Sequence, residues 1–304
     1  MKVVAALDFG SNTLKLTVAS LTPAGALEVR FEDAVITRIG EGLDKNGYLL
    51  DAAMERTLVE LARLADLARA HGAHEIAAVG TAGLRGASNA EAFLARVKAE
   101  TGFEVEVIHG LREAELAFAA PSIAFGPGPV AVMDLGGRST ELAVGQGPRI
   151  TARTSLEIGS VRLTERALLS DPPSPEMLER ARALVREALA ARPSLTPDTT
   201  LVGVSGTVQA LLGLELGIHD AARLADEGEG RTLHRASVEE WLQRFAIVPA
   251  ADRVRGTILP PLRADVILGG MIIVLETMAA YGRDEMGVSG RGVRYGLLLE
   301  RLRP

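Results

Sequence analysis

Three glycine-containing loops, each at the end of an apolar run, carry the residue types that bind phosphate. They read Asp8-Phe9-Gly10-Ser11-Asn12-Thr13, Asp134-Leu135-Gly136-Gly137-Arg138-Ser139-Thr140 and Gly203-Val204-Ser205-Gly206-Thr207. Glycine lets the backbone approach a ligand closely, and successive amide N–H groups then form a nest for an anion. Hydroxyl side chains add further hydrogen-bond donors. The pattern therefore predicts phosphate binding at these loops.

The first two loops belong to an internal repeat. Sliding the sequence by 126 positions places Asp8 on Asp134, Gly10 on Gly136, Leu16 on Leu142 and Val18 on Val144. Each copy is the same unit: an apolar strand, an Asp-x-Gly turn, a short polar loop and a second apolar strand. Such repetition indicates a duplicated domain. An aspartate at the end of each repeated strand can hold a divalent cation directly or through water.

The elements that position these loops alternate between strands and helices. In the first half we expect strands at residues 3–7, 14–20, 27–31, 35–39, 76–79 and 103–108. Asp51 is expected to cap a helix that ends before Gly72, and Ser88 with Glu91 forms a capping box for the next helix. A further helix is expected from about residue 112. This alternation is typical of an α/β fold.

The second half repeats the alternation after a Pro- and Gly-rich boundary at residues 121–129. We expect strands at 130–135, 141–144, 201–204 and 286–289, and helices at 160–169, 175–191, 263–280 and 293–302. Ser237 with Glu240 is a second capping box. The expected domains are residues 1–122, joined by the C-terminal helix at about 292–304, and residues 123–291.

Composition excludes several classes of protein. The chain has 304 residues, 47% of them hydrophobic, and no cysteine, which excludes disulfide scaffolds, thiolate metal sites and cysteine nucleophiles. The net charge of −6 does not attract nucleic acid or an anionic membrane, so an anionic partner needs a local pocket. The longest apolar stretch, residues 266–275, is too short to span a membrane. We expect a cytoplasmic protein without a signal peptide.

The motifs together resemble a known family. The paired Asp-x-Gly loops resemble the actin/Hsp70/sugar-kinase superfamily, whose two duplicated, ribonuclease H-like domains hold a phosphate ligand in a cleft between them. Within it, the chain resembles the exopolyphosphatase/guanosine pentaphosphate phosphatase (Ppx/GppA) family. The matching segments are Leu7–Thr13 (D-x-G-S-N-[ST]), Gly80–Asn89 (T-x-x-L-R-x-A-x-N), Ile108–Ala114 (S-G-x-E-E-A), Asp134–Glu141 (D-[IL]-G-G-G-S-T-E), Val204–Ala210 and Ser289–Gly296.

The resemblance implies release of orthophosphate from the end of a phosphate chain. It implies Glu113 as general base for the attacking water and Arg85 as the group that neutralises the transferred phosphate. Asp134 and Glu141, joined by Asp8, are implied ligands of Mg²⁺, with Mn²⁺ as an alternative. The implied phosphate-binding residues are Ser11, Asn12, Thr13, Gly136, Gly137, Arg138, Ser139, Thr140, Ser205, Gly206 and Thr207.

Two residues depart from the family pattern. Arg138 stands where the family has the third loop glycine, and Arg112 where it has the first of two paired glutamates. Arg138 would strain the loop if its position required a positive φ, or its guanidinium would grip the phosphate chain. Arg112 would lower the pKa of Glu113 and weaken it as a base, or would point to solvent.

Several alternatives remain open at this point. Inorganic polyphosphate is the expected substrate, and guanosine pentaphosphate is the alternative. A polyphosphate- or nucleotide-binding sensor without turnover is a hypothesis of another class, motivated by Arg112 and Arg138. A sugar kinase or acetate kinase of the same superfamily is a further alternative. A homodimer is compatible with the sequence, and no nucleic acid or membrane partner is expected.

Overall fold

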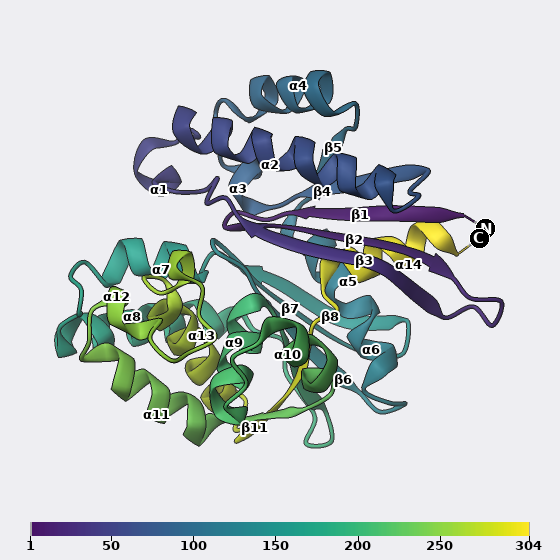
Figure 1. Ribbon diagram of the computed structural model, residues 1–304. Helices are drawn as coiled ribbons and strands as arrows, with labels where there is room; N and C mark the ends of the chain where they lie inside the picture. The colour runs from purple at the N-terminus through teal and green to yellow at the C-terminus, as the bar shows by residue number, and fades with distance from the viewer. Residues whose placement is uncertain (1, 304) are drawn as a thin grey trace. The chain divides into compact units, whose positions relative to one another are not determined.

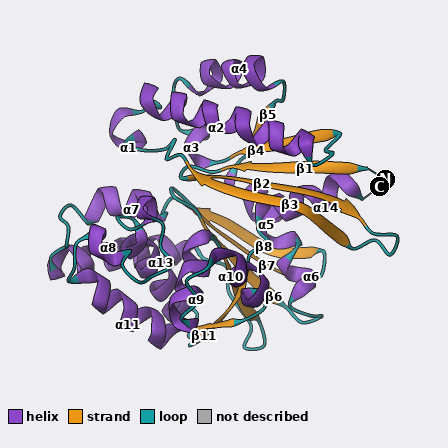
Figure 2. Cartoon of the chain, in the orientation of Figure 1, coloured by secondary structure: helices purple, strands orange, loops and turns teal. Residues whose placement is uncertain are grey.

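The computed structural model describes residues 2–303, and these divide into two compact units. Unit 1 comprises the chain up to Ala120 together with the segment that begins at Val293, and unit 2 comprises Pro121–Gly292. Each unit is a mixed β-sheet flanked by helices (Figures 1 and 2). The predicted α/β class is therefore confirmed.

Unit 1 is built on a sheet with strand order β3-β2-β1-β4-β5 within the described residues. Its strands are β1 (Val3–Phe9), β2 (Thr13–Leu21), β3 (Leu27–Ile36), β4 (Glu75–Gly80) and β5 (Val105–Val107). Its helices are α1 (Leu43–Asn46), α2 (Asp51–Ala70), α3 (Ala82–Arg85), α4 (Ala90–Thr101), α5 (Gly110–Ala119) and α14 (Val293–Leu302). In Figure 1, α2 and α4 lie over one face of this sheet, and α5 and α14 lie over the other.

Unit 2 is built on a sheet with strand order β10-β11-β9-β6-β7-β8 within the described residues. Its strands are β6 (Val130–Leu135), β7 (Thr140–Gln146), β8 (Arg149–Leu156), β9 (Thr200–Val204), β10 (Thr232–His234) and β11 (Glu285–Ser289). Its α-helices are α6 (Pro121–Ala124), α7 (Ser160–Ala167), α8 (Pro175–Ala188), α9 (Gly206–Leu216), α10 (Ala221–Gly228), α11 (Arg235–Ala246), α12 (Ala250–Arg253) and α13 (Ile267–Ala280). Two short 3₁₀ turns, Leu189–Ala191 and Pro261–Arg263, complete it.

The duplication predicted from the sequence is visible in the strand pairing of the two sheets. β1 pairs antiparallel with β2 and parallel with β4, just as β6 pairs with β7 and β9. The β2–β3 register shifts between Val18 and Ala19, and the β7–β8 register shifts between Val144 and Gly145, again 126 positions apart. A bulge at the same place in both copies indicates that the two sheets bend alike.

Several helix starts differ from the predicted caps. Asp51 is the first residue of α2 rather than its cap, which is Leu50. Neither capping box forms, because α4 begins after Asn89 and α11 after His234, and neither cap makes a side-chain hydrogen bond to its helix. The Asn89 side chain instead donates to the carbonyl of Leu49 and accepts from its N–H. It therefore forms a tertiary contact and does not cap α4.

Separate hydrophobic cores lie under the two sheets. In unit 2, α13 supplies a continuous buried stretch from Ile267 to Met278 and packs against α7, α8, α9 and α11. A helix that is apolar on all sides is what a helix inside a protein core requires. Within residues 2–303, no helix is long and apolar enough to cross a membrane.

Helix α14 belongs to unit 1 although it follows unit 2 in the sequence. It packs against α5, β1 and β2. The contact with α5 is so close that a Cβ on Gly296 would lie 2.1 Å from the carbonyl oxygen of Leu116. The C-terminal helix therefore fixes the position of α5 against the sheet.

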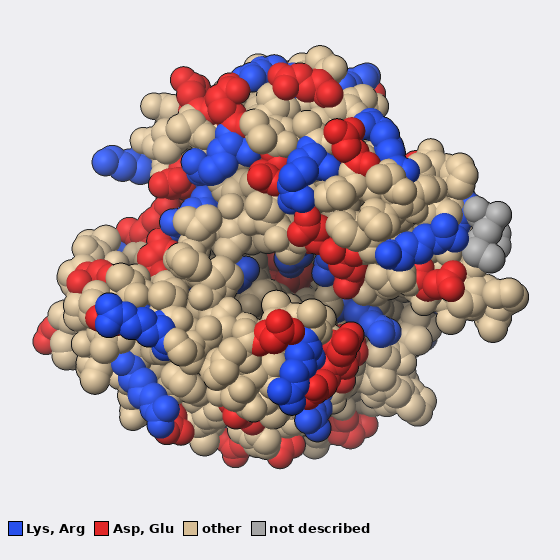
Figure 3. Space-filling view, viewed as in Figure 1, with Lys and Arg blue, Asp and Glu red and all other residues tan. Residues whose placement is uncertain are grey.

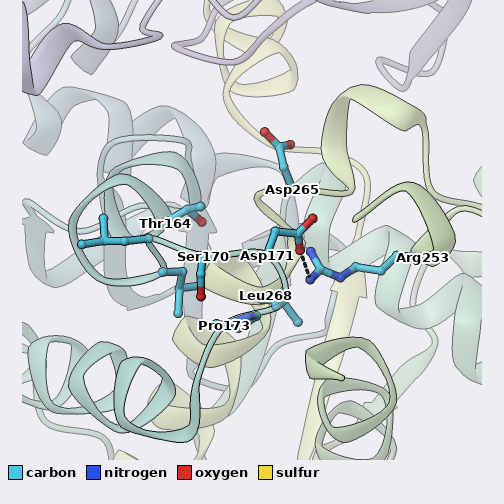
Figure 4. Close-up of a pocket in the computed structure, with 9 residues that line it drawn as sticks. Thr164, Ser170, Asp171, Pro173, Arg253, Asp265 and Leu268 are labelled. Carbon is cyan, nitrogen blue, oxygen red and sulfur yellow. Dashed lines mark hydrogen bonds and ion pairs between the residues drawn. The ribbon is translucent and has the colours of Figure 1, made fainter. Parts of the chain in front are cut away.

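A buried arginine ties together the helical side of unit 2. Arg253, 2% exposed, donates to the carbonyls of Phe245, Val248 and Ala264 and to Asp171 Oδ1 at 2.6 Å. Figure 4 shows this guanidinium directed at Asp171 on the wall of a pocket of about 180 Å³. All three of its nitrogens already donate to protein acceptors, which makes it a structural clamp.

Basic and acidic side chains are interspersed over the face shown in Figure 3. Many of them form ion pairs, such as Arg63 with Asp33 and Arg96 with Glu55. The visible face therefore carries no broad field of one sign, and attraction of a polyanion has to come from local groups.

Candidate active site

The first loop of unit 1 offers backbone donors at the carboxyl end of β1. The N–H of Gly10 donates to the carbonyl of Thr13, which closes the turn. The N–H groups of Ser11 and Asn12 donate to no other group within residues 2–303, and Asn12 Oδ1 is buried there without a hydrogen-bond partner. Two successive free amides and an unused buried oxygen are what an anion-binding or metal–phosphate nest requires.

The surrounding chain holds this loop in place. The carbonyl of Asn12 accepts from the N–H groups of Thr37 and Arg38, and Arg38 has a positive φ of 54°. On the other side, a Cβ on Gly83 would lie 2.9 Å from Ser11 Cα, so only glycine allows this approach. The sequence reasoning did not identify Arg38, and an outlying backbone angle next to a ligand loop is typical of functional sites.

Asp8 lies at the end of β1 opposite Lys15 of β2, its Cα partner in the ladder. Lys15 Nζ is 3.8 Å from Asp8 Oδ2. Burial raises the pKa of Asp8 above its ordinary value, and the charges of Lys15 and Arg294 oppose this only in part. Unit 1 therefore supplies its own cations for this carboxylate.

Glu113 lies in the first turn of α5 and is 6% exposed. Arg85, at the end of α3, donates through Nη1 to Glu113 Oε2 at 3.1 Å and to the carbonyl of Ile108 at 2.7 Å. The two residues that the sequence assigned to the chemistry are thus an ion pair, and Arg85 orients the carboxylate as well as bringing a positive charge.

Arg112 neither points to free solvent nor contacts Glu113. Its Nη1 donates to Glu115 one turn along α5 at 3.2 Å, and its Nη2 donates to Glu300 of α14. The residue that departs from the family pattern therefore serves the packing of α5 against α14.

The second loop, in unit 2, closes as the first one does. The N–H of Gly136 donates to the carbonyl of Ser139 at 3.0 Å, and the N–H groups of Gly137 and Ser139 make no hydrogen bond within the part of the chain that the structure describes. The start of α7 braces the loop from behind, because the N–H groups of Ser160 and Val161 donate to the carbonyls of Gly136 and Gly137. The loop carbonyls are thus occupied while the amides remain available for an anion.

Asp134 and Glu141 are direct partners across the antiparallel β6–β7 pair. Directly opposed residues project from the same face with Cβ atoms about 5 Å apart. Glu141 is 1% exposed, and its Oε1 accepts from Ser155 of β8 at 2.7 Å. Two adjacent carboxylates beside a phosphate loop suit Mg²⁺, which binds proteins through one or two carboxylates together with substrate phosphates.

No group of three or more His, Asp or Glu residues within residues 2–303 is placed to hold a metal ion on its own. At the repeated position, unit 1 has Lys15 where unit 2 has Glu141. The residue opposite the aspartate is therefore a cation in unit 1 and a second carboxylate in unit 2.

Arg138 does not have a positive φ, so the glycine-to-arginine departure introduces no backbone strain. The side chain is 2% exposed and lies 4.0 Å from Glu165 of α7. Burial, with the charges of Arg162 and Arg166, lowers the pKa of Arg138 to about 10, so it is charged at neutral pH. It places a positive charge behind the second loop.

The third loop begins α9 at the carboxyl end of β9. Ser205 caps the helix by accepting from the N–H of Val208 at 3.0 Å, and the N–H groups of Gly206 and Thr207 remain available for an anion. A Cβ on Gly206 would lie 2.6 Å from Arg263 Nη2, so the guanidinium packs directly on this glycine.

Arg263 is a residue that the sequence reasoning missed as a functional candidate. Its side chain makes no hydrogen bond or ion pair with any residue from 2 to 303, and burial lowers its pKa to about 10. An unpaired guanidinium held against the start of a helix is arranged to receive an anion. The sequence shows only that Arg263 precedes a long apolar helix. Its contact with Gly206 joins residues 57 positions apart, which local sequence patterns do not predict.

Within unit 1, the loop of Ser11, Asn12 and Thr13 lies against the segment that carries Arg85. Arg85 in turn contacts Glu113. Within unit 2, the structure brings together Asp134, Glu141 and the Gly136–Thr140 loop, and it adds Arg263 to Ser205, Gly206 and Thr207. Phosphate-type loops at the carboxyl ends of strands, a buried glutamate held by an arginine, and a carboxylate pair are the features expected of a phosphoryl-transfer protein.

The comparisons with known proteins agree with this class. The model of the Ppx/GppA phosphatase family matches residues 17–303. Exopolyphosphatase 2 of Mycobacterium tuberculosis is 34% identical, with 97% of each chain covered. A guanosine-5'-triphosphate,3'-diphosphate pyrophosphatase of Vibrio atlanticus is 29% identical over 97% of this chain and 58% of its own. The crystal structure of the Aquifex aeolicus Ppx/GppA family member superposes with a TM-score of 0.83 at 32% identity, covering 99% of this chain and 97% of that one.

The chain therefore belongs to the Ppx/GppA phosphatase family. Its members are hydrolases that act on phosphoric anhydrides, and the resemblance stated from the motifs is confirmed over nearly the whole chain.

Proposed function

We propose that this protein is an exopolyphosphatase, which releases orthophosphate from the end of inorganic polyphosphate. The observation that carries the proposal is the buried carboxylate of Glu113, which accepts a hydrogen bond from Arg85. The other motif residues of the chain lie in loops of the phosphate-binding type. The relative named as an exopolyphosphatase matches along its whole length, whereas the guanosine-nucleotide relative is matched over only 58% of its length. This difference favours polyphosphate over the nucleotide.

The proposed reaction is a hydrolysis of the terminal anhydride bond. Glu113 removes a proton from a water molecule, the water oxygen bonds to the terminal phosphorus, and the bridging oxygen leaves with the shortened chain. Arg85 neutralises negative charge on the transferred group while it keeps Glu113 in position. The free amides of the first and second loops and the start of α9, with Arg263, bind phosphate oxygens.

Asp134 and Glu141 would hold the metal, for which we propose Mg²⁺, with Asp8 as a further candidate ligand. When bound, such an ion neutralises phosphate charge and orients the reacting oxygens. The raised pKa of Asp8 and its contact with Lys15 make it the weakest of the three candidates. Glu141, whose Oε1 accepts a hydrogen bond from Ser155, is held in a fixed position by β8.

The test is a comparison of substrates at equal concentration of terminal phosphate, with Mg²⁺ present. We expect faster orthophosphate release from polyphosphate than from guanosine pentaphosphate. Faster release from the nucleotide would reverse the assignment. Binding of polyphosphate without any release would show a sensor rather than an enzyme.

A further inference from the structure

A second polar cavity lies in unit 2, away from the phosphate loops. It has a volume of about 580 Å³, within the range of small-molecule sites, and it is lined by the loop at residues 192–197 and by Ala280, Tyr281 and Arg283. This loop leads into the amino end of β9, whereas the Ser205–Thr207 loop follows the carboxyl end of the same strand. The five residues of β9 separate the two places by about 13 Å along the strand.

Two arginines face this cavity without a carboxylate partner. Within residues 2–303, neither Arg192 nor Arg283 forms an ion pair, and no Asp or Glu lines the cavity. Arg192 donates to the carbonyls of Leu189 and Ala280, and Arg283 donates through Nη2 to the carbonyls of Thr196, Pro197 and Thr199. These bonds hold the loop and the end of α13, and they leave Nη1 and Nε of Arg283 unused.

Two buried polar atoms at the cavity have no hydrogen-bond partner in residues 2–303. They are Arg283 Nε and the hydroxyl oxygen of Tyr281. Burial raises the pKa of Tyr281 to about 12, so the hydroxyl keeps its proton and can donate to an anion at neutral pH. The Arg192 guanidinium lies 5.5 Å from the centre of the Tyr281 ring, and Arg192, Tyr281 and Arg283 all line the cavity. Buried polar atoms normally have partners, which here points to an absent ligand.

The local charge also favours an anion. The carboxyl end of α13 contributes about half a negative charge, whereas the two guanidinium groups contribute two full positive charges. Asp198 lies on the same loop outside the cavity lining. A hydrogen bond with the Thr196 side chain is the main cause that lowers the pKa of this exposed carboxyl, and the charge of Arg283 adds to it. Positive charge therefore prevails inside the cavity.

We propose that this cavity is a second binding site, separate from the catalytic residues, for a small phosphate-bearing anion. Nη1 and Nε of Arg283, the remaining N–H groups of Arg192 and the Tyr281 hydroxyl bind the phosphate oxygens. A forked guanidinium matches this geometry. The phosphate group is common to free orthophosphate and to a nucleoside monophosphate, and the experiment separates these two sources.

The test is hydrogen–deuterium exchange on the full chain carrying Glu113→Gln, which prevents turnover of bound phosphates. Inorganic phosphate and guanosine 5'-monophosphate are added separately at millimolar concentration. We expect slower exchange in residues 189–200 and 279–284, apart from any change at residues 134–140. Protection by inorganic phosphate shows that the phosphate group suffices for binding. Protection by guanosine 5'-monophosphate but not by inorganic phosphate shows that the cavity also contacts the nucleoside.

Three variants make the test specific. Arg192→Gln is expected to weaken this protection about tenfold in apparent affinity, because it removes charge-assisted hydrogen bonds. Tyr281→Phe removes an oxygen that has no protein partner, so it should fold normally and weaken binding by about threefold to tenfold. Arg180→Gln, on the exposed face of α8, is the matched control and should bind as the parent does.

The proposal is overturned if neither anion slows exchange at residues 189–200 and 279–284, or if Tyr281→Phe and Arg180→Gln bind equally well. In a wild-type background, Tyr281→Phe should leave orthophosphate release from polyphosphate intact. Loss of the second site is therefore distinguishable from a failure of the proposed catalytic function.

Discussion

At the scale of single residues, the candidate site places charges where the fold alone would not favour them. Asp8 is a carboxylate that burial disfavours, and Arg263 is a guanidinium without a protein partner. A buried charge without a protein partner destabilises the folded state, and such charges are typical of sites where a ligand binds them. Both residues are therefore expected to trade stability against function.

Asp8→Asn should raise the melting temperature at pH 7 by about 2 to 4 °C while lowering polyphosphate turnover. The raised pKa means that the folded protein binds more protons at this position than the unfolded chain does. Its stability therefore falls as pH rises from the ordinary value of 3.8 through the raised one. Thermal unfolding at pH 4 and pH 7 measures this, and the variant's advantage should be smaller at pH 4. An equal gain in melting temperature at pH 4 and pH 7 would contradict a raised pKa of Asp8.

Arg263→Met should raise the KM for polyphosphate about tenfold without lowering the melting temperature, because it removes a charge that we propose binds substrate and that has no partner among the described residues. Steady-state kinetics and thermal unfolding measure the two effects. Arg255→Met is the control, since Arg255 is exposed and pairs with Asp252. A loss of stability without a change in KM would show that Arg263 is structural.

At the scale of elements, glycines and helix starts set the shape of the loops. The braces at Gly83 and Gly159 bring neighbouring segments within 3 Å of where a Cβ would lie. Local period and turn residues predicted most of the strands and the three loops. They did not predict β8 or β10, and the two strands expected at residues 27–31 and 35–39 are the single strand β3, which ends at Ile36. The helix starts predicted at Ser88 and Ser237 were wrong, and the position of Arg263 was not predicted, because these depend on contacts between segments far apart in sequence. The role of Asn89 as a tie to Leu49 illustrates this.

Gly159→Ala should displace the second loop and lower kcat/KM at least tenfold. A Cβ there would lie 2.4 Å from the backbone nitrogen of Arg138 and 2.6 Å from the carbonyl oxygen of Gly137, so backbone has to move. Overpacking of this kind costs about 1 to 3 kcal/mol. Gly128→Ala, where a Cβ would have no neighbour within 4 Å, is the control. Unchanged kinetics of the Gly159 variant would show that the close contact between Gly159 and the second loop does not position that loop.

At the scale of the whole molecule, one duplicated unit has diverged into two different charge arrangements. The strand order, the bulge and the Gly turn are shared by both copies, and the residue opposite the aspartate is not. Lys15 neutralises Asp8 in unit 1, while Glu141 doubles the negative charge of Asp134 in unit 2. The sequence alone predicted the duplication, but it did not show that the residue opposite the aspartate is a cation in one copy and a carboxylate in the other.

Glu141→Gln should raise the Mg²⁺ concentration needed for half-maximal activity at least tenfold, because one of the two adjacent carboxylates proposed to bind the metal loses its charge. Lys15→Gln changes the equivalent position of the other copy and should leave the Mg²⁺ requirement within about twofold of the parent. Titration of activity with Mg²⁺ measures both. A larger shift for the Lys15 variant would place the metal with Asp8 instead.

The central claim is that Glu113 is the base for release of orthophosphate, and one kinetic comparison tests it most directly. Initial rates of release from polyphosphate with saturating Mg²⁺ are measured for the parent, Glu113→Gln and Glu115→Gln. Glu115 lies two residues further along α5 and pairs with Arg112. The account predicts a fall in kcat of about 100-fold or more for Glu113→Gln and a near-parental rate for Glu115→Gln. A parental rate for Glu113→Gln would contradict it.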